Sequence, residues 1–179
     1  MSTPPYYGFV EDTKITCKVD GKEKEVAIQD LRAGTLVKTS TGDFRPVEKI
    51  GTRTLNNPGH SDRIPNRLYT LSKSAYPSLT EDLITTGVQA LLVSDATDAE
   101  RRQMVAIRGR ITVTDKKFCY PCAADEKAVP FTTAGSVTVF SFSIAHPIRM
   151  MTYGVYANGL LVEPMPSGTM ANPMISLLQ

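Results

Sequence analysis

Short runs of apolar and β-branched residues, separated by turn residues, make up most of this chain. The run 14–19 is followed by Asp20-Gly21 and then by a second run, 24–27. Both turn residues tolerate the positive φ angles of a two-residue hairpin, so this stretch predicts two antiparallel strands. We expect further strands at 36–39, 44–52, 68–72, 83–85, 90–93, 111–113, 117–120, 137–144, 153–156 and 160–163. Asn, Pro and Gly between 54 and 66 predict a surface loop there.

One segment, 98–108, has the pattern of an α-helix. Thr97 and Glu100 are spaced as a capping box before it, and Gly109 supplies a stop after it. A single helical turn is also expected at 28–31. The sequence therefore predicts an all-β domain with one main helix.

Length, composition and charge limit the function classes. The chain has 179 residues, the length of one domain, and its 41% hydrophobic and 21% charged residues are ordinary for a globular protein. A net charge of +2 with scattered basic residues gives no reason to expect nucleic acid. No apolar run reaches the length of a membrane span, and the first residues lack a signal-peptide pattern. Three cysteines fit a reducing compartment better than a disulfide framework.

Five separated segments resemble, in the same order, the motifs of the Hint family, the hedgehog and intein fold. The first, 8–15, is similar to the family's opening, which runs Cys-Phe, two variable residues, then Gly-Thr-Lys-Ile. The others are 31–39, 85–93, 113–123 and 153–163. The later segments resemble the Hint-domain proteins of large double-stranded DNA viruses. The resemblance implies a Hint-like horseshoe at 8–165, with an N-terminal extension at 1–7 and an extended tail at 166–179.

The positions that carry the family's reaction are changed in this chain. Glycine stands where the family has its nucleophilic cysteine, glutamine where it has the activating histidine, and serine where viral relatives tend to have another histidine. A Glu-Pro pair replaces the His-Asn of inteins. These degenerate positions, with the retained threonine of the histidine motif, are Gly8, Thr86, Gln89, Ser141, Glu163 and Pro164. None is expected to be active, because glycine forms no thioester and a neutral amide shuttles no proton.

Four separate changes favour a naturally inactive relative over an engineered mutant, which would typically differ at one position. The seven residues before Gly8 also look more like a native amino terminus than an excised flank. Gly8→Cys combined with Gln89→His is the change expected to restore any activity, provided that the pocket is still open. The rival interpretation is an autoprocessing cis-peptidase, as a natural variant or an active-site mutant, with another nucleophile such as Ser2, Thr3 or Thr13.

Cys119 and Cys122 form a C-x-x-C motif, which occurs in redox dithiols and zinc sites. They are weak candidates, because Cys17, His60 and His146 are too far away in sequence to complete a ligand set. Two buried thiols near a turn are the favoured interpretation. No phosphate loop or dinucleotide motif is present, so no cofactor is expected.

The leading hypothesis is a structural or interaction protein, and specifically a minor capsid protein of a large DNA virus, located in the virion or the host cytoplasm. Its expected partners are proteins, such as capsid subunits, rather than nucleic acid or membrane. The segments 4–7 and 164–179 carry aromatic, Met or Leu side chains that a partner could bury. We expect contacts with neighbouring subunits to order one or both ends. The family's two ends meet at its reaction site, so Gly8 is expected near Gln89 and near the segment 158–163.

Overall fold

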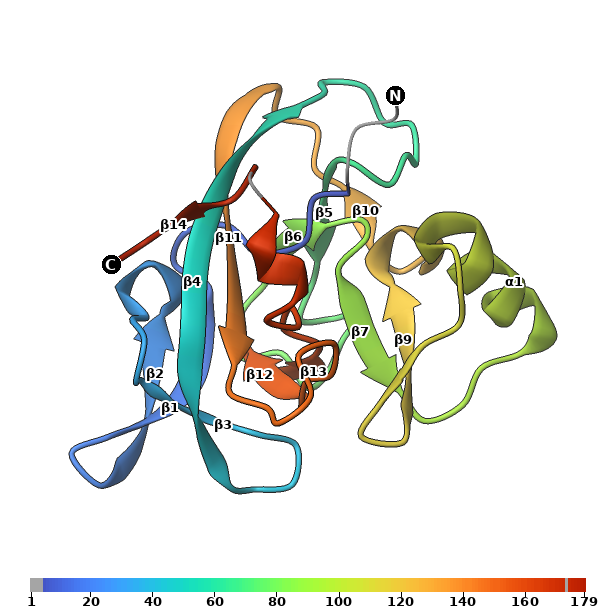
Figure 1. The fold of residues 1–179 in the computed structure, drawn as a ribbon. Helices are drawn as coiled ribbons and strands as arrows, with labels where there is room; N and C mark the ends of the chain where they lie inside the picture. Colours follow the sequence, from blue (N-terminus) through green and yellow to red (C-terminus); the bar gives the residue numbers. More distant parts are fainter. Residues whose placement is uncertain (1–4, 173) are drawn as a thin grey trace.

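The computed structural model describes residues 5–172 and 174–179. Within these residues the chain forms an 11-stranded sheet, a 3-stranded sheet and one α-helix (Figure 1). The prediction of an all-β fold with one main helix is therefore confirmed. No helix among these residues is long and apolar enough to span a membrane.

The strands follow one another along the chain with three short 3-10 helices between them. The strands are β1 (Lys14–Val19), β2 (Lys22–Ala27), β3 (Leu36–Lys38), β4 (Phe44–Asn57), β5 (Leu68–Leu71), β6 (Leu83–Thr86), β7 (Ala90–Val93), β8 (Val113–Thr114), β9 (Lys117–Pro121), β10 (Val129–Pro130), β11 (Gly135–Ile144), β12 (Val155–Ala157), β13 (Leu160–Val162) and β14 (Ser176–Leu177). The 3-10 helices are η1 (Ile28–Asp30), η2 (Cys122–Ala124) and η3 (Thr169–Ala171).

The larger sheet brings the two halves of the chain together. Its order is β11-β4-β3-β1-β12-β13-β7-β9-β8, with β2 paired to β1 and β14 paired to β4. The smaller sheet has the order β10-β5-β6. The pairing of β1 with β12 places the first strand of the domain beside the last segment of the resemblance.

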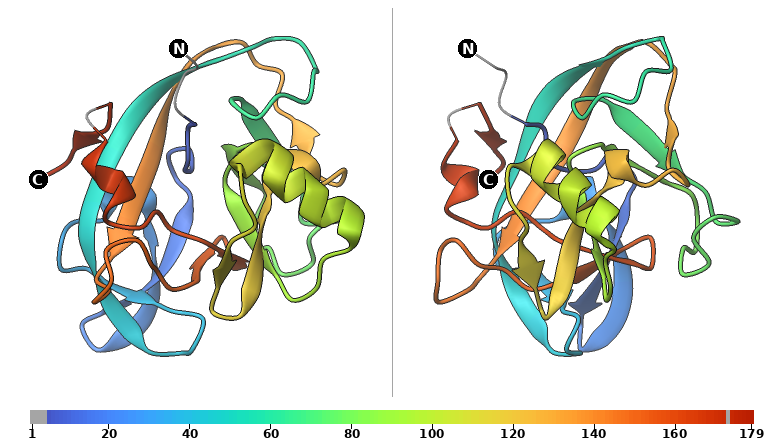
Figure 2. Two further views of the ribbon diagram at one scale, coloured as in Figure 1. Left: turned by 45° about the vertical axis from the view of Figure 1, so that its right-hand side comes forward. Right: turned by 90° about the vertical axis from the view of Figure 1, so that its right-hand side faces the viewer.

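The β1–β2 turn and the helix follow the local sequence signals. Asp20 and Gly21 both have positive φ, 52° and 77°, as the two-residue turn requires. The helix α1 (Asp98–Arg108) begins after Thr97, whose side chain accepts from the Glu100 amide in a capping box. Gly109 ends the helix in the left-handed conformation. Figure 2 shows α1 lying over β9, against which it packs.

The prediction of a loop at 54–66 is wrong at its start, because β4 continues to Asn57. Tertiary pairing overrides local propensity here, since β4 and β11 form one long antiparallel ribbon that begins with Gly135 opposite Asn57. The Asn57 side-chain amide donates to the carbonyl oxygens of Phe131 and Thr133, at 2.7 and 2.9 Å. A residue typical of turns is thus used to fasten the end of the ribbon to the next loop.

The C-terminal segment 166–179 does not extend away from the domain. It contains η3 and β14, and β14 pairs with the middle of β4 (Figure 1). Met165, Met170 and Ile175 form a buried cluster against which Tyr7 packs. The approach is close at Gly51, where a Cβ atom would lie 2.4 Å from Ile175 Cγ2.

The N-terminal residues are fastened in a similar way. The Arg53 guanidinium lies 3.7 Å from the centre of the Tyr6 ring and donates to the Pro5 carbonyl at 3.1 Å. The described residues of both ends thus make contacts within the chain, although Met174 and Leu177 remain exposed. That neighbouring subunits order the ends stays a prediction.

The packed C-terminal segment predicts different effects for two nearby methionines. Met170→Ala is expected to lower the free energy of unfolding by about 2–5 kcal/mol, because the side chain is buried and its loss leaves a cavity. Met174→Ala is the matched control, since that side chain is 58% exposed and its removal should change stability little. Urea denaturation of both variants measures the difference. Equal, small effects would mean that the segment is not docked in solution.

Candidate functional site

The backbone at Gly8 is held by two strands at once. The Gly8 carbonyl oxygen accepts from the Thr86 amide at 3.1 Å and from the Thr85 hydroxyl at 2.6 Å. The next residue, Phe9, exchanges two backbone hydrogen bonds with Phe140 of β11, at 2.9 and 2.7 Å. These bonds fix the Gly8–Phe9 peptide between β6 and β11.

Gly8 is also closed to any side chain. Its φ is 132°, a conformation that residues with a Cβ atom rarely adopt. A Cβ built on Gly8 would lie 2.1 Å from the Phe140 carbonyl oxygen and 2.9 Å from Ser141 Oγ. Ser141 in turn donates a hydrogen bond to the Tyr7 carbonyl oxygen. The position therefore lacks a nucleophile and, in this backbone arrangement, also has no room for one.

Gln89 is buried and its side-chain amide is already engaged. Nε2 donates to the Glu163 carbonyl oxygen at 2.6 Å, and the Gln89 backbone amide donates to the Thr86 carbonyl at 3.2 Å. The hydroxyl of Thr86 is buried and has no hydrogen-bond partner among the described residues. Gln89 thus fastens the end of β13 to the start of β7, and it offers no titratable group for proton transfer.

The six positions named from the resemblance lie in one region. Thr86 links Gly8 to Gln89 through backbone hydrogen bonds, and Gln89 bonds directly to Glu163. Nearby, the Lys14 backbone amide donates to Asn158 Oδ1 at 2.7 Å, and the Lys14 carbonyl oxygen accepts from the Asn158 backbone amide at 2.8 Å. The expected meeting of Gly8 with Gln89 and the segment 158–163 is therefore confirmed.

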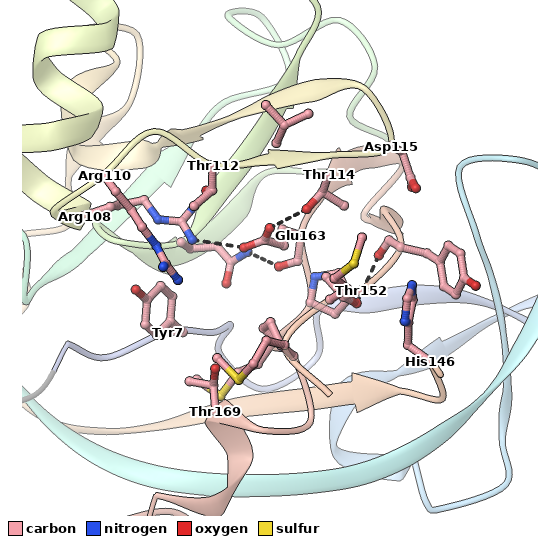
Figure 3. A pocket seen from close by; sticks show the side chains of 18 residues that line it. Tyr7, Arg108, Arg110, Thr112, Thr114, Asp115, His146, Thr152, Glu163 and Thr169 are labelled. Carbon is pink, nitrogen blue, oxygen red and sulfur yellow. Dashed lines mark hydrogen bonds and ion pairs between the residues drawn. The ribbon is translucent and has the colours of Figure 1, made fainter. Parts of the chain in front are cut away.

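The Glu163 carboxylate is buried and bound by three donors. Arg108 Nη2 lies 3.0 Å from Oε1, and Thr114 Oγ1 lies 2.7 Å from Oε2 (Figure 3). Cys119 Sγ lies 2.9 Å from Oε2. Burial has the largest single effect on the pKa of Arg108 and lowers it, but attraction to the Glu163 carboxylate, with smaller contributions from Tyr7 and Cys119, leaves the pKa raised. The pair is a static, charge-compensated contact between the end of α1 and the end of β13.

A cavity of about 520 Å³ opens beside this ion pair. Its lining combines the Tyr7 side of the Tyr7–Gly8 peptide with the Glu163–Pro164 peptide, so both ends of the domain border the same space. Its walls come from β8, the loop 145–154 and the C-terminal segment (Figure 3). The lining residues are Tyr7, Gln89, Arg108, Arg110, Thr112, Val113, Thr114, Asp115, His146, Met150, Met151, Thr152, Tyr153, Glu163, Pro164, Met165, Pro166 and Thr169.

The cysteines are buried, free thiols. Burial and the neighbouring Glu163 carboxylate raise the pKa of Cys119 to about 11, and burial raises the pKa of Cys122. A reactive cysteine needs the opposite shift, because the thiolate is the nucleophile. Within residues 5–172 and 174–179, no group of three or more His, Cys, Asp or Glu side chains is placed to hold a metal ion.

The alternative nucleophiles gain no geometric support from the described residues. Ser2 and Thr3 lie outside them. Thr13 is buried and its hydroxyl donates to the Val10 carbonyl at 2.8 Å. His60 is exposed, while His146 is half-buried beside Tyr153, and each ring accepts from a backbone amide two residues ahead.

The most polar features of the site were not found from the sequence. In the sequence Arg108 is an ordinary basic residue in the last turn of a helix. Its contact with Glu163 joins positions 55 residues apart, so no local pattern indicates it. Arg110, Thr112 and Asp115 lie between the helix and β9 and match no motif. The only available signal was the density of polar residues after the helix, which is also typical of a surface loop.

No family model and no curated protein matches this chain. Among solved structures it is similar to a DnaB intein from Synechocystis sp. PCC 6803, at a TM-score of 0.48 and 12% identity, over 89% of this chain and 99% of that chain. It is also similar to the gp41-1 intein, at a TM-score of 0.43 and 11% identity, over 88% of this chain and 98% of that chain.

The closed geometry at Gly8 predicts a large loss of stability on adding one methyl group. Gly8→Ala should lower the free energy of unfolding by about 3–5 kcal/mol, because backbone strain and overpacking act together. Gly135→Ala is the matched control: its φ is 131°, yet a Cβ there meets nothing within 4 Å. It should show the strain alone, about 1–2 kcal/mol. Thermal or urea unfolding of both variants tests this, and equal losses would show that Phe140 does not close the position.

The buried ion pair predicts a second contrast. Glu163→Gln keeps the shape of the side chain but leaves the Arg108 charge without its partner, which should cost about 3 kcal/mol or more. Glu23→Gln breaks the exposed 2.7 Å pair with Lys38 and should change the free energy of unfolding little, because solvent screens the pair. Urea unfolding at neutral pH measures both. A loss for Glu163→Gln no larger than for Glu23→Gln would contradict the buried, compensated pair.

Proposed function

We propose that this chain is a Hint-like domain that has lost the self-cleaving reaction and serves as a structural or interaction protein. Two observations support the family assignment: the five similar segments occur in the family's order, and they fold so that the start of the domain meets its end. The geometry at Gly8 is the observation that carries the loss of reaction.

The first step of Hint chemistry is an attack on the preceding carbonyl, here that of Tyr7, by a thiol or hydroxyl at the first position. Gly8 has neither group, and the Phe140 carbonyl oxygen occupies the direction in which its side chain would point. The Tyr7 carbonyl oxygen instead accepts a hydrogen bond from Ser141. Contacts that hold the fold have replaced contacts that would activate a peptide bond.

The later steps lack their groups as well. Gln89 would have to donate a proton to the leaving amide nitrogen, but its amide is neutral and is bound to the Glu163 carbonyl oxygen. Pro164 has no side-chain amide and does not cyclise as asparagine does. Each step of cleavage therefore lacks its reagent in the described structure.

The interaction role draws support from the exposed surface. Three large apolar side chains, Ile148, Met150 and Met151, are about half exposed on the single loop 145–154. The edge strand β2 carries alternating Lys and Glu side chains, which disfavour pairing with another sheet. We therefore place the partner contact on this loop, with a protein partner, because the small net charge favours neither nucleic acid nor an anionic surface.

The specific role we propose is a minor capsid protein of a large double-stranded DNA virus. It rests on the viral resemblance of the segments 113–123 and 153–163, together with the loss of the reaction. Proteomic analysis of purified particles of the source virus tests this role. The chain should copurify with the capsid at constant stoichiometry through successive gradients, and its absence from particles despite abundance in infected cells would exclude it.

Inertness is tested by fusing a passenger protein before residue 1 and incubating the fusion with dithiothreitol or hydroxylamine. Intact-mass measurement should show the uncleaved fusion only, because no thioester can form at Gly8. A self-splicing intein on the same passenger is the positive control. Gly8→Cys with Gln89→His is also expected to stay uncleaved, since Phe140 fills the space that the cysteine needs. Release of the passenger from the unchanged chain would favour the autoprocessing alternative and end this proposal.

A further inference from the structure

The cavity beside Glu163 contains a cation with an unused donor. The Arg108 side chain is only 10% exposed, and its Nη2 is bound to the Glu163 carboxylate. Its Nη1 is also buried, and it has no hydrogen-bond partner among the described residues. A buried N–H group left without an acceptor is costly, so such groups nearly always have a partner from the protein or from a ligand.

A second unused donor lines the same cavity. Thr112 Oγ1 is buried and has no partner in the described part of the chain. Arg108 and Thr112 lie on either side of the turn that joins α1 to β8. Both residues line the same cavity, and their unpartnered atoms are covered just beneath its wall, which marks this end of the cavity as suited to an acceptor.

The charge distribution selects the kind of acceptor. All the nearby negative charge is already bound: Glu163 accepts three hydrogen bonds, while Asp115 accepts from Ser40 and from the Gly154 amide. Arg110 lines the cavity on the Arg108 side, and Asp115 lies at the other end (Figure 3). The Arg108 end therefore presents donors and positive charge, which suits an anionic acceptor.

The remaining walls are apolar. Met150, Met151 and Met165 line the cavity together with Pro164 and Pro166. Methionine side chains adapt to irregular apolar ligands, and the volume of about 520 Å³ is typical of small-molecule sites. A phosphate or sulfate ion would leave this apolar volume unfilled, whereas a carboxylate attached to an apolar chain would use both parts.

We propose that this cavity binds a carboxylate carried on an apolar chain, with Arg108 and Thr112 donating to the carboxylate and the three methionines enclosing the chain. Arg110 adds attraction at the entrance. A free alkyl carboxylate and the C-terminal carboxylate of an apolar peptide share this chemistry. The site does not depend on whether the self-cleaving reaction has been lost, because it uses groups outside that reaction.

Isothermal titration of the full chain with octanoate tests the proposal, with 1-octanol and octylamine as matched probes. Octanoate should bind at least about tenfold more tightly than either, since hydrogen bonds from a charged donor are the stronger ones. An acetyl-Leu-Leu peptide with a free carboxylate, compared with its amide, distinguishes the peptide source from the free one. Equal affinity for octanoate and octanol, or no binding by any carboxylate probe at millimolar concentration, would overturn the proposal.

Variants locate the binding. Thr112→Val removes the hydroxyl at nearly constant volume and should weaken octanoate binding by about tenfold. Arg110→Gln should weaken octanoate binding less. Arg102→Gln is the control, an exposed arginine of α1 that does not line the cavity. Arg108→Gln alone would leave the buried Glu163 carboxylate without its cationic partner. The double variant Arg108→Gln with Glu163→Gln is therefore used, and thermal unfolding checks that it is folded. Unchanged affinity in Thr112→Val and in a folded double variant would refute the assignment.

Discussion

The antiparallel contact between Phe9 and Phe140, with Gly8 pressed against the same strand, is the constraint on which the rest of the site depends. Phe9 lies between β11 and β6 and bridges both, so the N-terminal segment passes between two strands of the domain. The Gly8 Cα lies against the Phe140 carbonyl, where a Cβ would come within 2.1 Å of the oxygen, so this arrangement requires glycine. The absence of a side chain at this position and the tight closure of the domain are thus linked.

The polar groups around this contact serve the same end. Gln89 ties β7 to the Glu163 carbonyl, and the Glu163 carboxylate ties β13 to the end of α1 through Arg108. A reactive site keeps donors free and pKa values near neutrality. Here Gln89 donates to a main-chain oxygen, the Glu163 carboxylate accepts from three side chains, and the pKa of Cys119 is raised by its burial beside Glu163. These contacts hold the two halves of the domain together at their junction.

The sequence predicted the features that depend on neighbouring residues and missed those that depend on distant contacts. The turn at Asp20-Gly21 and the capped helix α1 were predictable, because each is determined by a few adjacent residues. The extension of β4 to Asn57 and the docking of β14 were not, since both depend on pairing with distant strands. The positions around Gly8 were located by resemblance to motifs. The pairing of Arg108 with Glu163 had no sequence signal, because a basic residue in the last turn of a helix is ordinary.

The open cavity beside this closed junction adds a further step. Its walls include Tyr7 from the N-terminal end and Met165 and Pro166 from the C-terminal segment, so the site is complete only while both ends are docked. A ligand that binds only this arrangement stabilises it by mass action, and the gain in free energy grows with the logarithm of its concentration over its dissociation constant. Met150 and Met151 line the same cavity and are also exposed on the loop to which we assign the partner contact. Occupation of the cavity and the shape of that surface are therefore linked through shared side chains.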